Sequence, residues 1–169
     1  MCKLAFLLAL TSFPAGAADF RAIDVGQSCD TVQAWELAHG SIPIPSHTSS
    51  GASVYAYTAD EYGQHIVVTY LCKNGTLFTG NREFPVGSWS QAVENYRKLY
   101  ESLRSEYGVP AREGHPWDDR SDQQEIAEHW IRHMTVWRVS EGNVMLTIQP
   151  NQPFKPELPI WRVCVAAGK

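Results

Sequence analysis

The feature that most constrains the fold is the strand-like run "QHIVVTYLC" at 64–72, rich in β-branched and aromatic residues and followed after Lys73 by Asn74–Gly75. Successive side chains of a strand point to opposite faces, so one face of this segment would carry Ile66, Val68, Tyr70 and Cys72. An Asn-Gly pair between two strand-like runs is the strongest short signal for a β-hairpin. The sequence therefore predicts a strand at 64–72, a tight turn, and a returning strand at 76–84.

A long amphipathic helix follows this hairpin. Ser88 and Gln91 fit a capping box, and Gly108 followed by Pro110 is typical of a helix end, so we expect a helix over 88–107. Its apolar residues recur at helical spacing: Ala92, Val93, Tyr96, Leu99, Tyr100, Leu103 and Tyr107. The tyrosines leave a binding surface open as an alternative, but the spacing favours a stripe that faces the core.

The other segments complete a mixed fold. Ser28 is a candidate N-cap for a first helix over 28–39, and the Ser-, Pro- and Gly-rich residues 41–53 read as a loop. Strand-like runs are "VYAYT" (54–58), "MTVWRV" (134–139), "VMLTIQ" (144–149) and "PIWRVCVAA" (159–167). We expect an α+β fold in which an antiparallel sheet carries both helices on one face. Helix-then-strands occurs twice, which suggests two half-units.

The first 17 residues have the layout of a secretory signal peptide. Lys3 supplies a positive start, Leu4–Leu10 an apolar run, and "AGA" at 15–17 a cleavage motif of small residues. The apolar run is shorter than the roughly 20 residues that span a bilayer. Cys2 precedes the run, which argues against a lipid anchor. We expect no transmembrane segment, and a single mature domain, 18–169, that is periplasmic or secreted.

Export bears on the three cysteines that follow the leader, since oxidising compartments favour disulfides. Three pairings are possible for Cys29, Cys72 and Cys164. Cys29 lies on the apolar stripe of the first helix, and Cys72 ends the same-face run of the 64–72 strand. If that stripe packs on that face, the two sulfur atoms meet. We therefore predict a Cys29–Cys72 disulfide and a buried Cys164 thiol.

Two histidines four residues apart, His129 and His133, raise the possibility of a metal site. On a helix the two rings would lie about 6 Å apart on one face, which suits a single ion. In a strand the same spacing is about 13 Å. The window 130–139 is rich in β-branched and aromatic residues and leads into a hairpin. We therefore expect no metal and no other cofactor.

Charge and motifs narrow the function classes. The net charge is −4 and no basic cluster is present, so nothing points to nucleic acid as a partner. Ser88 and Ser90 are explained by helix initiation, because the Gly-x-Ser-x-Gly spacing of a nucleophile elbow is missing. No catalytic residue can be assigned from the sequence. Whether the protein is an enzyme stays open, with a non-enzymatic role favoured.

The polar segment 111–124 holds the best candidates for contact with a partner. Trp117 lies beside Asp118 and Asp119, so an apolar anchor would be combined with charges that steer a basic partner. An exposed tryptophan on a loop of a rigid scaffold is typical of a contact residue. Trp117 as a lid that covers the sheet is the alternative.

The order of elements resembles the tandem architecture of the beta-lactamase inhibitory protein family and of related small periplasmic α+β modules. The resemblance covers the mature chain and rests on element order alone. This chain departs from the pattern in having no second cysteine pair and no lipid-attachment cysteine. It implies a periplasmic module that binds another protein, such as an inhibitor or an immunity protein that neutralises a toxin or hydrolase. An envelope-assembly or cell-wall-binding accessory and a small periplasmic hydrolase are the alternatives.

Overall fold

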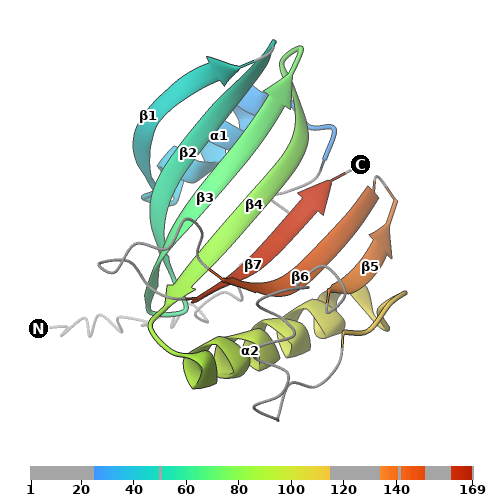
Figure 1. Ribbon diagram of the computed structural model, residues 1–169. Coiled ribbons are helices and arrows are strands. Elements are labelled where there is room, and N and C mark those ends of the chain that lie inside the picture. The colour runs from blue at the N-terminus through green and yellow to red at the C-terminus, as the bar shows by residue number, and fades with distance from the viewer. Residues whose placement is uncertain (1–24, 50, 115–133, 141, 151–160, 169) are drawn as a thin grey trace, which may run out of the picture.

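The computed structural model describes residues 25–49, 51–114, 134–140, 142–150 and 161–168 (Figure 1). In this part of the chain it has two helices and one seven-stranded antiparallel sheet. The elements are α1 (Cys29–Ala38), β1 (Ile42–Ser49), β2 (Ala52–Glu61), β3 (Gln64–Lys73), β4 (Thr76–Val86), α2 (Trp89–Tyr107), β5 (Thr135–Val139), β6 (Gly142–Pro150) and β7 (Trp161–Gly168). The predicted α+β class is confirmed.

The strand order shows how the two helix-then-strands segments join. The order is β1-β2-β3-β4-β7-β6-β5, so each segment forms one side of the sheet. The last strand of the first segment, β4, pairs with the last strand of the second, β7. The two halves therefore share one continuous sheet, because β4 and β7 are paired with each other where the halves meet.

Two-residue turns set the register of the longest strands. Asn74–Gly75, predicted as a turn, has φ values of 53° and 74° and joins β3 to β4. Tyr62–Gly63 has φ values of 52° and 73° and joins β2 to β3 in the same way. Positive φ at both central residues defines a type I′ turn, whose twist matches that of the flanking strands. Glycine supplies the second position of each turn without strain.

Both helices pack on the same face of the sheet. Cross-strand partners share a face, and the register connects Val68 to Arg82, Arg82 to Val165, and Val165 to Leu146. On this face α1 contacts Arg82, and α2 contacts β4, β5, β6 and β7. Figure 1 shows α1 behind the β1–β3 side of the sheet and α2 across the lower end of the other side.

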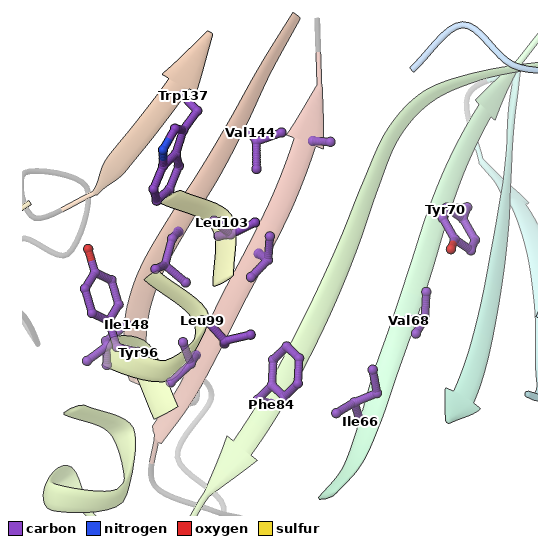
Figure 2. Close-up of a cluster of buried hydrophobic side chains, with 14 of the residues drawn as sticks. Ile66, Val68, Tyr70, Phe84, Tyr96, Leu99, Leu103, Trp137, Val144 and Ile148 are labelled. Atoms are coloured by element: carbon purple, nitrogen blue, oxygen red, sulfur yellow. The ribbon is translucent and has the colours of Figure 1, made fainter. Parts of the chain in front are cut away.

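The stripe of α2 forms the centre of the hydrophobic core (Figure 2). Its buried apolar residues are Ala92, Val93, Tyr96, Leu99 and Leu103, all of them predicted. They meet buried side chains of the sheet, among them Phe84, Trp137, Leu146, Ile148 and Val163. Ser88 accepts a hydrogen bond from the backbone N–H of Gln91 at 3.3 Å, which confirms the predicted cap. The tyrosine-rich stripe is therefore a core-facing stripe.

The prediction of a loop at 41–53 is wrong, because β1 lies there. Its residues "IPIPSHTS" have loop-like composition, but they pair with β2 from Ile42 opposite Thr58 to Ser49 opposite Ala52, with a shift after Ile44. Proline lacks a backbone N–H, so a strand with two prolines is best tolerated at the edge of a sheet, which is where β1 lies. The partner strand, which local composition does not encode, makes this segment a strand.

Candidate functional site

The contact residues predicted from sequence, Trp117, Asp118 and Asp119, lie outside the described residues. So do His129 and His133, and the absence of a metal at these histidines stays a prediction. Among the described residues, no group of three or more His, Cys, Asp or Glu side chains is arranged to hold a metal ion.

The start of the predicted contact loop is described, and it is firmly attached to the sheet. The backbone N–H of Ala111 donates to the Val136 carbonyl at 2.8 Å, and Val136 donates to the Arg112 carbonyl at the same distance. The Tyr100 hydroxyl of α2 donates to Glu113 at 2.5 Å, and the Gly114 N–H donates to the Thr135 hydroxyl at 2.8 Å. Residues 111–114 are thus fixed along the outer side of β5.

A disulfide joins α1 to the sheet. It links Cys29, the first residue of α1, to Cys72 on β3, with the two Cα atoms 6.3 Å apart. Both residues are buried on the helix-bearing face. This is the predicted pairing, and it arises for the predicted reason, because the apolar stripe of α1 lies over the face that carries Tyr70 and Cys72.

Cys164 is a free, buried thiol, as predicted. It alternates with Val163 and Val165 on β7, so it lies on the face opposite the helices and opposite Glu83 of β4. Burial, reinforced by the Glu83 carboxylate, raises the pKa of the Cys164 thiol to about 12. A thiol with such a pKa carries almost no thiolate near neutral pH and is a poor nucleophile.

A buried polar cluster connects α1 to three strands, and sequence reasoning did not single it out. Arg82 of β4 forms an ion pair with Glu61 at the end of β2 and a second with Glu36 of α1, the latter at 3.3 Å. Glu36 also accepts hydrogen bonds from the hydroxyls of Tyr70 and Ser41. We call Glu36, Ser41, Glu61, Tyr70 and Arg82 the α1 cluster.

The electrostatics of the α1 cluster follow from its burial. Desolvation raises the pKa of the Glu61 carboxyl above its ordinary value; the Arg82 charge opposes this shift and Glu36 adds to it. Desolvation also raises the pKa of the Tyr70 hydroxyl, which therefore stays protonated and can donate to Glu36. Because Glu36 and Arg82 are almost completely buried, a substrate cannot reach either without displacing α1. The cluster attaches the helix to the sheet.

The face of the sheet opposite α1 and α2, which we call the helix-free face, carries no helix among the described residues. Side chains on it form rows that run across the strands, and two neighbouring rows cross all seven. The one that we call the central row consists of Ile44, Ala56, Thr69, Asn81, Ala166, Met145 and Val136. It contains no charged residue and no large aromatic ring.

The charged residues of the helix-free face lie outside this row; they include Glu83 and Arg162 beside it, Arg138 of β5, and the exposed Asp60–His65 pair near the β2–β3 turn. Arg162 of β7 forms an ion pair with Glu83 of β4 at 3.0 Å, and Asn81 donates to the same carboxylate at 2.8 Å. The outer side of α2 is different, since it exposes charged residues along its length, including Glu94 paired with Lys98 at 2.7 Å. A partner that contacts this uncharged row, and the Glu83–Arg162 pair beside it, would have to desolvate few unpaired charges.

Comparisons with known proteins do not assign this chain to a class. No protein-family model matches the sequence, and no curated protein and no solved structure was found to match it. The architectural resemblance to the beta-lactamase inhibitory protein family therefore stays a prediction. Among the described residues, neither helix is long and apolar enough to cross a membrane.

Proposed function

We propose that this protein is a non-enzymatic module that binds another protein outside the cytoplasm, in the periplasm or after secretion. The location is supported by the leader at 1–17 and by the Cys29–Cys72 disulfide, because disulfides persist in oxidising compartments. An inhibitor or immunity protein fits this class.

The observation that carries the binding function is the uncharged central row of the helix-free face. Protein interfaces are depleted of charged residues at their centre and have a polar rim. Here the uncharged Thr69 and Asn81 lie mid-row, and the two charges of the neighbouring Glu83–Arg162 pair compensate each other. All seven strands contribute, so the surface is wide enough for a macromolecular partner.

Rigidity supports the same function. Both helices, the disulfide and the α1 cluster lie behind the helix-free face and fix the sheet from one side. The loop that begins at Ala111 leaves from the anchored edge at β5. A preorganised surface avoids the free-energy cost of ordering side chains and loops on association. Trp117, Asp118 and Asp119 would add an anchor and steering charges at that edge.

Site-specific photocrosslinking in cells of the source organism tests this function. A photoreactive residue replaces Thr69, in the central row, and in a matched control it replaces Glu101 on the exposed side of α2. We expect an adduct of one defined mass at position 69 and none at 101. Equal labelling at both positions, or a hydrolase activity of the purified mature protein that is lost on changing one histidine, would overturn the proposal.

A further inference from the structure

Residues 42–45 of β1 form an exposed apolar strip at the edge of the sheet. All four residues are exposed, with Ile42 at 67% and Ile44 at 36% of full exposure. Ile42 pairs with Thr58 and Ile44 with Ala56, so both isoleucine side chains extend the helix-free face. A run of consecutive exposed apolar residues is unfavourable in water and is retained where it has a function.

The backbone of this strip has an unusual hydrogen-bond inventory. Residues that flank a two-residue turn form a hydrogen-bonded pair, which fixes Glu61 opposite Gln64. Alternation then directs the even-numbered residues of β2 toward β1, so Ile42 and Ile44 use their backbone groups inside the sheet. The backbone carbonyl of Pro43 therefore points away from β2, toward the outer edge of the sheet. Neither Pro43 nor Pro45 has a backbone N–H. The outer edge at 42–45 therefore offers carbonyl acceptors and no donor.

The lack of backbone donors at 42–45 limits the kinds of partner that can bind this edge. Strand addition needs donors and acceptors to alternate along the edge, so an added β-strand finds no donor at 42–45. A second copy of this chain whose two-fold axis passes through the strip would bring the same acceptor-only strip. Neither copy could then donate to the other. The strip instead fits a partner that supplies the donors itself.

The strip is also fixed before binding. The ring of each proline holds its own φ near −65°, and the residue before a proline is restricted to extended conformations. Pairing with β2 fixes Ile42 and Ile44 further. Proline-rich segments in the polyproline II conformation dock into grooves lined with aromatic side chains. Residues 42–45 are a strand paired with β2 on one side, but their outer edge likewise presents exposed prolines and carbonyl acceptors. Trp and Tyr combine an apolar ring with an N–H or O–H that can donate to a carbonyl.

We propose that residues 42–45 dock into a groove of the partner protein lined with aromatic side chains, at least one of which donates a hydrogen bond to the Pro43 carbonyl. This site deepens the protein-binding function proposed above and rests on it. The central row would contact the same partner, because Ile44 belongs both to that row and to the strip.

Methyl NMR of the isoleucines tests the chemistry of the strip directly. The mature protein is labelled at the Ile δ1 methyl groups and titrated with N-acetyltryptophanamide or with its 1-methylindole analogue, which lacks the donor. We expect saturable shifts for Ile42 and Ile44, none for the buried Ile66 and Ile148, and several-fold weaker binding of the methylated analogue. Equal binding of both probes, or no shift at Ile42 and Ile44, would overturn the aromatic-donor site.

A second experiment separates this site from the proposed function. The adduct formed through position 69 is measured in wild type, in an Ile42→Ser, Ile44→Ser variant, and in a Val109→Ser control that alters an apolar residue exposed to 82%. We expect at least a tenfold loss of adduct in the double variant alone, with unchanged circular dichroism. An undiminished adduct would refute the strip while the binding function stands. No adduct in wild type would refute the binding function itself.

Discussion

The two halves of the sheet hold their helices by different means. α2 has 19 residues and buries an apolar stripe against β4, β5, β6 and β7. α1 has only 10 residues and buries Cys29, Val32 and Glu36, one of which is charged. A covalent bond and a buried ion-pair cluster hold it instead. A helix too short to bury much apolar area can thus be fixed by a few strong, specific contacts.

The two kinds of attachment differ in their weaknesses. An apolar interface loses stability gradually as methylene groups are removed, and it is insensitive to redox conditions and nearly insensitive to pH. A buried ion pair loses its compensation as soon as one partner is removed, and a disulfide fails on reduction. The α1 half should therefore respond to charge substitutions, reductant and pH, whereas the α2 half should not.

The largest expected effect is that of Arg82→Met, which leaves Glu36 and Glu61 buried without their counter-charge. Removing one partner of a buried pair typically lowers the free energy of unfolding by about 3–5 kcal/mol. Denaturant titration followed by circular dichroism measures it. Lys98→Met, which breaks the exposed pair with Glu94, should change the same quantity by less than about 1 kcal/mol. Similar effects of the two substitutions would contradict a structural role for the α1 cluster.

Loss of the disulfide comes next. Cys29 and Cys72 are 43 residues apart, and the chain-entropy relation gives about 4 kcal/mol for a loop of that size. A Cys29→Ala, Cys72→Ala variant should lose about this much stability and become insensitive to reductant. Leu103→Ala, a core substitution in α2, should also be destabilised but keep the reductant sensitivity of wild type. Peptide mapping without reduction checks the pairing, and a linked peptide containing Cys164 would contradict it.

A smaller effect is expected at the contact between the halves. The Gln64 amide, at the β2–β3 turn, exchanges two hydrogen bonds with Asn95 of α2, at 2.9 and 3.0 Å. A double-mutant cycle of Gln64→Ala and Asn95→Ala should give a coupling energy of about 1 kcal/mol. Additive effects of the two substitutions would mean that these side chains do not connect the first half to α2.

The smallest effect should appear in the pH dependence of stability. Burial raises the pKa of the Glu61 carboxyl in the folded protein above its value in the unfolded chain. The contribution of Glu61 to the free energy of unfolding is therefore most favourable below the pKa of the unfolded chain, and it is lost as pH rises through the pKa of the folded protein. Glu61→Gln should remove this loss above about pH 4.5. Glu94→Gln is a control of opposite sign, because hydrogen bonding to Lys98 lowers the pKa of Glu94. Identical pH profiles for wild type and Glu61→Gln would contradict the assignment.

Several features were determined by the sequence alone, because their signals are local. Ser88, Gly108 and the stripe between them define α2 within a single segment. Asn74–Gly75 specifies its own turn geometry. The Cys29–Cys72 pairing followed from two local periodicities, one helical and one of strand type, which placed each sulfur on an apolar face.

Only the tertiary structure decided the rest. β1 is a strand because β2 supplies hydrogen-bond partners to a segment whose composition is typical of a loop. The α1 cluster joins Glu36, Glu61 and Arg82, which are far apart in sequence and look like ordinary surface charges until the strands pair. The pairing of β4 with β7 continues the central row across all seven strands. Local patterns fix which face of an element is apolar, but the free energy of contacts between distant segments decides which elements meet.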